Sequence, residues 1–351
     1  MRARVKLPLT LVGGGALAVF VLFGLFHVQV PAAGGRFVLF GRSLAWTEGL
    51  VTRSLASLGV QNASAASGVA TPAAGSISCE SKGSGGYQLC HYTDKLGQTM
   101  NFFLFVPAAF EPAQKYPLVL VLHGGGERAR PGMTRAADDA VLEHAPYVKC
   151  WVGKPAHLND PSVQSRWPSF IVVPQLDGLS RWVDVPPSQG SYKMAPEPTA
   201  ELRMAKDIVD LLRQKYGNVD PNRLYITGIS LGGYGTWDAI ERWPGYFAAA
   251  VAVSGGGDPS KASLLKDMPI WVFHGSQDPI VPVSGSRDMV KAIEAAGGHP
   301  RYTEYAGAKH DIWARVYAVD TVNPSNNVFR WLFSQHKSPA AKQVARDVAR
   351  G

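Results

Sequence analysis

The sequence predicts an α/β domain between residues 98 and 335, built on a mostly parallel sheet with flanking helices. Short apolar runs alternate with amphipathic segments along this stretch, as strands and helices do in α/β proteins. Several of the runs are apolar at every position, which is typical of strands that are covered on both faces. No internal repeat is visible, and we expect a single folded domain.

The expected strands are short and bounded by polar or glycine-containing segments. They are Asn101–Val106, Leu118–Leu122, Phe170–Pro174, Leu224–Thr227, Ala248–Ser254, Ile270–Phe273 and Tyr302–Tyr305. The expected helices have apolar residues at helical spacing, and Gly297-Gly298 provides a stop signal for the third. They are Thr199–Tyr216, Gly233–Arg242, Ser284–Ala296 and Asn327–Gln335.

The net charge of +8 is located at the two ends of the 351-residue chain. Residues 1–75 contain six basic residues and one acidic residue, and residues 336–351 contain four and one. The segment between them is neutral, with 25 basic and 25 acidic side chains. A nucleic-acid-binding domain carries its positive charge on the folded surface, so we expect no nucleic-acid partner.

The amino terminus predicts export. Three basic residues precede a run from Leu7 to Gly35 that contains no charged side chain, with an apolar core at Leu9–Phe26. This core is closer to the ~20 residues of a spanning helix than to the ~7–15 of a signal peptide. We therefore favour an inner-membrane anchor at residues 7–30, and a signal peptide cleaved near Val30-Pro31-Ala32 is the alternative. Both place the remaining chain in the periplasm or outside the cell.

Composition divides the chain into four parts. They are a signal-anchor or signal peptide at 1–35, a linker at 36–75, a catalytic domain at 76–336 and a basic tail at 337–351. Cys79 and Cys90 enclose a loop rich in Gly and Ser, and in an exported protein we expect them to form a disulfide. Such a bridge would stabilise the fold by about 3 kcal/mol by restricting the unfolded chain. Cys150 would then remain unpaired.

A strand–turn–helix segment identifies a candidate nucleophile. The expected strand at Leu224–Thr227 leads into Gly228-Ile229-Ser230-Leu231-Gly232, a GxSxG sequence followed by a helix. In this context the serine occupies a strained turn, and small residues on either side allow the strand and helix to approach each other. The helix N-terminus supplies oriented backbone N–H groups. We expect Ser230 to be the nucleophile.

A glycine run follows the expected strand at Leu118–Leu122. Its sequence, His123-Gly124-Gly125-Gly126, lacks the lysine and the spacing of a phosphate-binding loop. Upstream of a GxSxG turn, such a run supplies an oxyanion-hole donor. We expect the N–H groups of Leu231 and Gly125 to be the donors, with Gly126 as the alternative for the second. His123 is expected to pack the loop.

The acid and the base should follow the nucleophile in the chain. Asp278 lies in the polar loop after the expected strand at Ile270–Phe273, where an orienting carboxylate belongs. The competing carboxylates lie before that strand or within a helix, and they are Asp258, Asp267 and Asp288. We expect His274 to pack this loop rather than to act as a base.

His310 is the expected general base, because it lies in the loop after the strand at Tyr302–Tyr305. His299 precedes that strand, and His336 lies near the carboxyl terminus. No HExxH sequence, CxxC sequence or helical pair of metal ligands is present, so we expect neither a metal nor a cofactor.

The segments that carry these residues resemble the α/β-hydrolase superfamily. They are YPLVLVLHGGGER, FIVVPQ, VDPNRLYITGISLGGYGTWD, WVFHGSQDPIVPVSGSRDMV and RYTEYAGAKHDIW. More narrowly, they are similar to a group of secreted esterases and "predicted peptidases" of the phospholipase/carboxylesterase type, related to polyhydroxybutyrate depolymerases and feruloyl esterases. The resemblance implies an eight-stranded sheet and a triad of Ser230, Asp278 and His310.

The predicted activity is hydrolysis of carboxylic esters through an acyl-enzyme, on a small or polymeric ester. Two alternatives remain open, a serine peptidase or polyester depolymerase, and an inactive membrane-tethered binding module. Aromatic residues of the expected loops are candidates for the pocket wall. They are Trp182 and Trp313, with Trp167 and Tyr192 as further possibilities.

Overall fold

The computed structural model describes the catalytic region with several gaps. The described residues are 75–80, 86–107, 110–130, 132, 142, 145, 148, 150–152, 162–318 and 327–337. The expected membrane segment, the linker up to residue 74 and tail residues 338–351 lie outside them. No helix within the described ranges combines the length and apolar composition needed to cross a bilayer.

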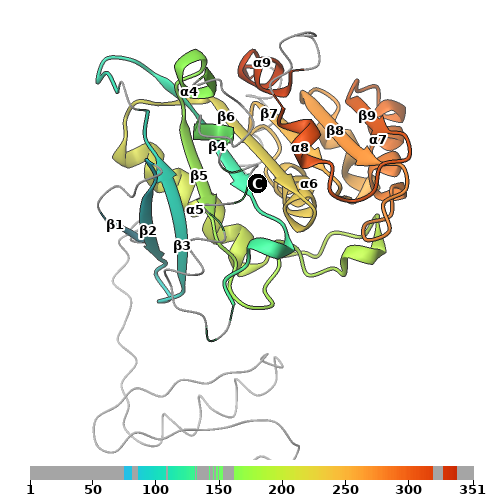
Figure 1. Cartoon of the computed structure of the whole chain (residues 1–351), viewed down its shortest axis with the longest axis horizontal. Coiled ribbons are helices and arrows are strands. Elements are labelled where there is room, and N and C mark those ends of the chain that lie inside the picture. The colour runs from blue at the N-terminus through green and yellow to red at the C-terminus, as the bar shows by residue number, and fades with distance from the viewer. Residues whose placement is uncertain are drawn as a thin grey trace, which may run out of the picture. The chain divides into compact units, whose positions relative to one another are not determined.

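A single nine-stranded sheet runs through the described residues (Figure 1). Its strands are β1 (Ser76–Cys79), β2 (Gln88–Thr93), β3 (Thr99–Phe105), β4 (Tyr116–Leu122), β5 (Phe170–Pro174), β6 (Val219–Ile229), β7 (Ala249–Val253), β8 (Ile270–Gly275) and β9 (Arg301–Tyr305). Their order is β1-β2-β3-β5-β4-β6-β7-β8-β9. Strands β4 to β9 pair in parallel, and β1 to β3 add antiparallel pairs at one end.

Helices pack against both faces of this sheet. They are α4 (Ser162–Arg166), α5 (Ala200–Lys215), α6 (Leu231–Arg242), α7 (Ser284–Ala295), α8 (Trp313–Val316) and α9 (Val328–Phe333). Short 3₁₀ turns connect them, and these are η1 (Gly125–Glu127), η2 (Cys150–Val152), η3 (Pro187–Gln189) and η4 (Pro259–Leu265). Thr199 caps α5 by accepting a hydrogen bond from the Leu202 N–H.

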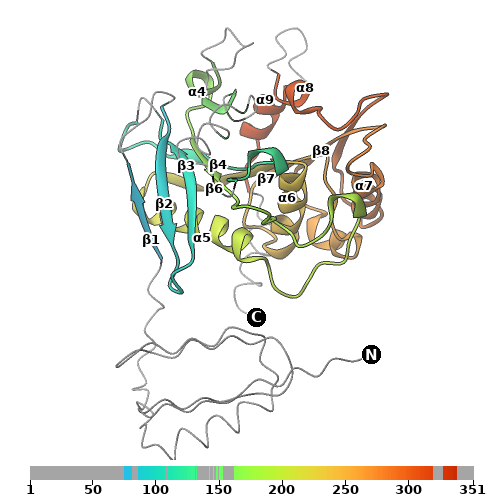
Figure 2. The same ribbon diagram turned by 60° about the horizontal axis from the view of Figure 1, so that its bottom comes forward.

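The α/β class and the mostly parallel sheet predicted from the sequence are confirmed. The seven expected strands correspond to β3 through β9, and the four expected helices correspond to α5, α6, α7 and α9. The expectation of eight strands is wrong for the described residues, because β1 and β2 add a hairpin beyond β3 (Figure 2). Their sequences, SISC and QLCHYT, lack the apolar runs by which the other strands are recognised.

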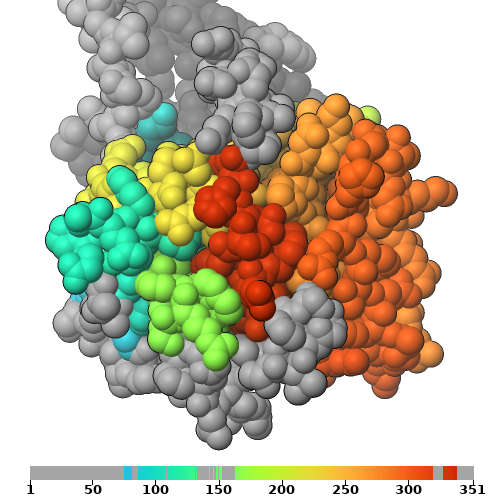
Figure 3. Space-filling view, turned by 90° about the horizontal axis from the view of Figure 1, so that it is seen from above, coloured from blue at the N-terminus to red at the C-terminus, as the bar shows by residue number. Residues whose placement is uncertain are grey.

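The two faces of the sheet carry separate apolar cores, since successive side chains of a strand point to opposite faces. On one face Leu118, Leu120 and Leu122 of β4 pack in the cluster that contains α5, α6 and α7. On the other face Val119 and Val121 pack in the cluster that contains α4, α8 and α9. Figure 3 shows α4 beside α9 on this second face.

A disulfide joins the two outermost strands. Cys79 and Cys90 lie directly opposite each other in the register of β1 and β2, and their sulfur atoms are bonded. Cys150 lies outside this disulfide and is buried. The disulfide therefore fastens the edge hairpin of the sheet.

Strand order determines where a site can form. Strand β4 lies between β5 and β6, so the connections that follow β4 and β6 leave toward opposite sides of the sheet. In open α/β sheets such a reversal opens a crevice beyond the carboxyl ends of the strands, where ligands bind. The glycine run after β4 and Ser230 after β6 both lie at this edge.

Replacing Cys79 with serine should lower the free energy of unfolding by about 3 kcal/mol, because the disulfide restricts the unfolded chain. The bridged residues are 11 positions apart. Urea unfolding followed by tryptophan fluorescence measures the loss. Reduced wild-type protein is the control, and it should unfold at the midpoint of the variant. Equal midpoints for the oxidised wild type and the variant would contradict the expectation.

Replacing Gly232 with alanine should destabilise the fold by about 3 kcal/mol or more, because overpacking against rigid backbone cannot be relieved cheaply. A Cβ at Gly232 would lie 1.9 Å from the carbonyl oxygen of Leu122. Gly217→Ala is the matched control, since a Cβ there meets nothing within 4 Å. Similar urea midpoints for the two variants would show that the close approach is unimportant.

Candidate active site

Ser230 occupies the turn between β6 and α6. Its backbone angles are φ 53° and ψ −116°, a region that residues other than glycine rarely adopt. The Ser230 N–H donates to the carbonyl of Val253 at 2.9 Å, which ties the turn to the end of β7. Glycines at 228 and 232 let strand and helix meet closely, since a Cβ on Gly228 would lie 2.1 Å from the Gly232 oxygen. The GxSxG sequence thus forms the strained elbow that it predicts.

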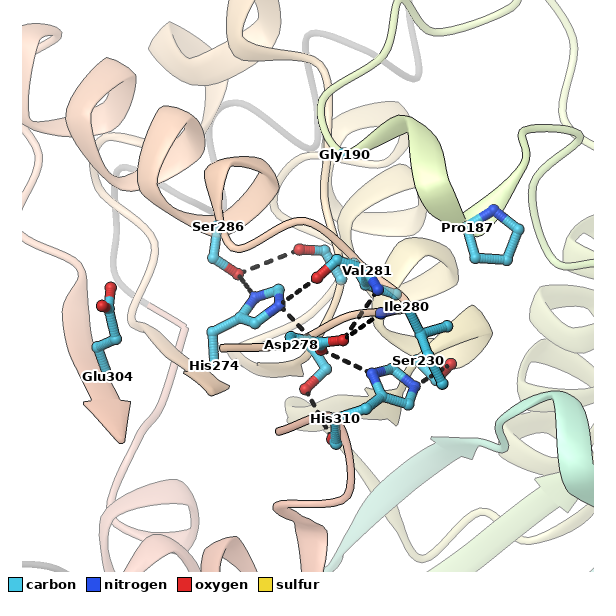
Figure 4. A network of polar contacts seen from close by, with 12 residues as sticks. Pro187, Gly190, Ser230, His274, Asp278, Ile280, Val281, Ser286, Glu304 and His310 are labelled. Atoms are coloured by element: carbon cyan, nitrogen blue, oxygen red, sulfur yellow. Dashed lines mark hydrogen bonds and ion pairs between the residues drawn. The ribbon is translucent and has the colours of Figure 1, made fainter. Parts of the chain in front are cut away.

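His310 reaches Ser230 from the loop after β9. The Ser230 hydroxyl lies 2.9 Å from His310 Nε2 (Figure 4). On the other side of the ring, Nδ1 donates to Asp278 Oδ2 at 2.7 Å. Because the carboxylate holds the hydrogen on Nδ1, neutral His310 presents the lone pair of Nε2 to the Ser230 hydroxyl. The imidazole is therefore oriented to accept the hydroxyl proton.

Asp278 is held by several donors in the loop after β8. Its Oδ1 accepts from the N–H groups of Ile280 and Val281, both at 2.9 Å. Its side chain is fully buried. Burial alone would raise the pKa of Asp278, but hydrogen bonds from His274, His310 and the two N–H groups hold it well below its ordinary value. Asp278 is thus an ionised carboxylate that orients His310.

The competing residues bond elsewhere or are exposed. Asp258 accepts from the N–H groups of Ser260 and Met194, and Asp288 accepts from the Ser191 hydroxyl. Three further candidates have exposed side chains, namely Asp267, His299 and His336. The structure brings together Ser230, Asp278 and His310.

The candidate oxyanion donors lie next to the nucleophile. Leu231 is the first residue of α6, and the first N–H groups of a helix have no partner within it. A Cβ on Gly125 would lie 3.5 Å from Leu231 Cδ1, so the start of η1 packs against the start of α6. A Cβ on Gly126 would meet nothing within 4 Å. Arg128 Nε donates to the Gly125 carbonyl at 3.1 Å, which fixes the orientation of this loop.

His123 fixes the same glycine loop through hydrogen bonds at both of its ring nitrogens. It is fully buried, its Nδ1 donates to the Gly124 carbonyl at 2.6 Å, and its Nε2 accepts from the Leu176 N–H at 2.9 Å. Burial lowers the pKa of His123 to about 4, which agrees with the single ring hydrogen that these partners require. This arrangement fits the loop-packing role expected for it.

The two predicted pocket-wall residues, Trp182 and Trp313, have different surroundings in the structure. Trp182 is fully buried, and its indole N–H donates to the His123 carbonyl at 3.0 Å. It therefore supports the glycine loop and presents no face to a substrate, so its placement as a wall is wrong. Trp313 lies edge-on to His310, with ring centroids 5.6 Å apart, and is partly exposed. Trp313 remains a candidate wall.

The two further aromatic candidates also pack internally. Tyr192 is buried and donates to Asp238 at 3.1 Å. Trp167 stacks on Phe333 of α9, with ring centroids 5.7 Å apart, in the apolar cluster that contains α4, α8 and α9. Tyr192 and Trp167 therefore make these contacts with residues outside the triad.

Sequence reasoning placed His274 as a residue that packs the loop after β8, and its contact with the Val281 carbonyl agrees with that role, but two contacts at the site were missed. His274, expected only to pack a loop, has Nε2 3.2 Å from Asp278 Oδ2. Ser254 follows β7 with φ 48°, and its hydroxyl lies 3.3 Å from the His310 carbonyl oxygen. His274 lies in one of the segments that resemble the α/β-hydrolases, but the spacing of that segment does not by itself predict either contact. In the part of the chain that the structure describes, no cluster of three or more His, Cys, Asp or Glu side chains could hold a metal ion.

Comparison with known proteins gives consistent relatives. The Esterase family model, described as "Putative esterase", matches residues 93–315. A solved structure described as "Crystal Structure of a Thermostable Esterase" is 36% identical with a TM-score of 0.59, over 72% of this chain and 63% of that chain.

Two curated relatives match shorter stretches. "Putative esterase NocK" of Nocardia uniformis subsp. tsuyamanensis is 25% identical over 191 residues, 52% of this chain and 46% of the relative. "Bifunctional acetylxylan esterase/xylanase XynS20E" of Neocallimastix patriciarum is 28% identical over 83 residues, 24% of this chain and 12% of the relative. The chain thus spans less than half the length of either.

The family match extends from β2 to α8 and includes the elbow, the glycine loop and both triad partners of Ser230. Because it covers more than half of the chain, the protein belongs to the esterase family of the α/β-hydrolase superfamily.

Proposed function

We propose that the protein is a serine hydrolase that cleaves carboxylic esters through an acyl-enzyme. The observation that carries this proposal is the continuous hydrogen-bond chain from Ser230 through His310 to Asp278, built on the strained turn before α6. Membership of the esterase family supports an ester as the substrate.

In the proposed reaction His310 Nε2 takes the hydroxyl proton while Ser230 Oγ attacks the ester carbonyl carbon. The N–H groups of Leu231 and Gly125, or Gly126 in place of Gly125, stabilise the negative oxygen of the tetrahedral intermediate. His310 then gives its proton to the leaving alcohol. Water, deprotonated by the same nitrogen, attacks the acyl-enzyme, and His310 returns this proton to Ser230 Oγ as the acyl–oxygen bond breaks and the acid is released. Asp278 stays ionised throughout and stabilises the imidazolium.

Apolar side chains near the triad favour an apolar or aryl acyl group. Ile280, whose N–H donates to Asp278, leaves half of its side chain exposed, and Trp313 borders His310. The segment that contains η3 is fastened to α6, because the Tyr234 hydroxyl donates to the Pro187 carbonyl at 2.8 Å and accepts from the Gly190 N–H at 3.1 Å. We assign this segment to the rim of the substrate site (Figure 4).

The proposal includes a location outside the cytoplasm, with residues 7–30 as an anchor in the inner membrane. The disulfide between Cys79 and Cys90 supports this location, because such bonds persist in oxidising compartments. Esters that reach the periplasm or the cell exterior would then be the substrates.

A fluorophosphonate probe should label the wild-type protein at Ser230, because the probe traps a serine whose hydroxyl is activated by a base. Ser230→Ala should abolish the label, and Ser263→Ala, which alters an exposed serine of η4, should retain it. Labelling is read by gel fluorescence and intact mass. A Ser230→Ala variant that is still labelled would remove Ser230 as the nucleophile.

Esters should be hydrolysed with a kcat/KM that exceeds that of matched amides by orders of magnitude. The measurement is a series of p-nitrophenyl esters of increasing acyl length, run beside p-nitroanilides of the same acyl groups. Ser230→Ala supplies the background rate. Amide turnover that rivals ester turnover would favour the peptidase alternative, and a preference for polymeric esters would favour the depolymerase.

A further inference from the structure

Asp278 contacts a second histidine besides His310. His274 belongs to the end of β8 and is fully buried. Its Nε2 lies 3.2 Å from Asp278 Oδ2, the same oxygen that accepts from His310 Nδ1 at 2.7 Å (Figure 4). The carboxylate is therefore held between two imidazole rings.

The hydrogen on His274 Nε2 follows from its surroundings. Besides Asp278 Oδ2, this nitrogen faces the Val281 carbonyl oxygen at 3.1 Å. Both neighbours are acceptors, so Nε2 carries a hydrogen and donates. With the Ile280 and Val281 N–H groups on Oδ1, Asp278 accepts from four donors.

The far side of the His274 ring is also held. Its Nδ1 lies 2.8 Å from the Ser286 hydroxyl of α7, and the same hydroxyl lies 3.1 Å from the Gly255 carbonyl oxygen. With the ring hydrogen on Nε2, Nδ1 is an acceptor for the Ser286 hydroxyl. The preceding residue, Ser254, contacts the His310 carbonyl. The contacts thus form a closed cycle that starts and ends at Asp278 and includes the backbone of His310.

We propose that His274 is a positioning residue for the Ser230–His310–Asp278 triad. Its Nε2–H keeps Asp278 Oδ2 aligned with His310 Nδ1, and it takes up part of the carboxylate charge that would otherwise act on His310. The inference rests on the proposed serine-hydrolase function. It assigns His274 no contact with substrate.

The charged side chains near His274 determine how a pH profile of activity can be interpreted. Glu304 lies opposite His274 in the register of β8 and β9, and Arg287 of α7 pairs with it at 2.6 Å. Hydrogen bonds from Arg287 and Tyr302 lower the pKa of Glu304 to about 2, although burial opposes them. Glu304 and Arg287 therefore keep constant charges near neutral pH, and Asp278 is ionised as well. Neither asparagine nor glutamine at position 274 titrates, so a difference between the acid limbs of those two variants reports on His310.

Two substitutions of His274 test the contacts of its two ring nitrogens separately. The amide nitrogen of glutamine can occupy the place of Nε2, so His274→Gln keeps a donor for Asp278 and loses the Ser286 contact. The amide of asparagine reaches only the place of Nδ1, so His274→Asn keeps the Ser286 contact and loses the donor. Both replace a buried ring by a smaller amide, and their packing losses are therefore comparable.

His274→Asn should lower kcat for a p-nitrophenyl ester by at least about tenfold, yet by less than the ~10⁴-fold loss that follows impairment of a triad carboxylate. KM should change little. The acid limb of kcat/KM should move to higher pH by ~0.5 unit or more, because the whole carboxylate charge then stabilises the His310 imidazolium. His274→Gln should restore most of kcat and the wild-type limb.

The outcomes discriminate between positioning and packing. Equal losses for both variants with an unchanged acid limb, in proportion to losses of stability measured by urea unfolding, would overturn the proposal. A wild-type rate and profile in His274→Asn would do the same. If that variant fails to fold, Ser286→Ala tests the ring from its other side. It should lower kcat modestly and shift the limb in the same direction, and an unchanged enzyme would count against the proposal.

Failure of the inference is distinguishable from failure of the proposed function. Fluorophosphonate labelling that persists in Ser230→Ala would show that the function itself is misassigned. Labelling that depends on Ser230, combined with a His274→Asn variant as active as wild type, would refute only the role of His274.

Discussion

The strained turn at Ser230 is the constraint on which the rest of the site depends. A residue other than glycine at φ 53° costs of order 1–3 kcal/mol, and it persists only where surrounding contacts enforce it. Here the enforcing contacts are the Val253 carbonyl on the Ser230 N–H and the close meeting of Gly228 with Gly232. The turn projects the hydroxyl beyond the sheet edge. It also places the first N–H of α6 beside it.

The end of β7 connects the parts of the site. The Val253 carbonyl accepts from the Ser230 N–H, and the Ser254 hydroxyl contacts the backbone of His310. The Gly255 carbonyl oxygen lies 3.1 Å from the Ser286 hydroxyl, which contacts His274. Three consecutive residues at the end of a central strand therefore contact all three parts of the triad. They contact the backbone of the nucleophile, the backbone of the base and the serine behind the histidine that bonds the acid. Since β7 is buried among β6, β8 and two helical layers, its position is fixed by the core.

The features that could be predicted from the sequence are those that depend on local patterns of residues. Strands β5 and β7 and long parts of β4, β6 and β8 are apolar runs, and the positions of Ser230, Asp278 and His310 follow from loops after strands β6, β8 and β9. The β1–β2 hairpin was not predicted, because its residues are polar and its pairing depends on β3 and on the disulfide. Trp182 was misplaced because an aromatic residue in a loop has no signature that separates packing from binding. The contact of His274 with Asp278 depends on how the loop after β8 folds back, which no periodicity encodes.

The disulfide at β1 also bears on how the sheet ends. An unpaired edge strand is a template for pairing with another chain, and proteins limit this hazard by keeping edge strands short or charged. β1 has only four residues, and β9 at the opposite edge carries Arg301 and Glu304. β2 has six residues and pairs with β3 on its inner side, and among the described residues its outer side is covered by the strand that Cys79 fastens in place. Reduction of this single bond would let β1 separate and uncover Cys90–Thr93, the four residues of β2 that pair with it, which makes the bond a safeguard against edge-to-edge aggregation.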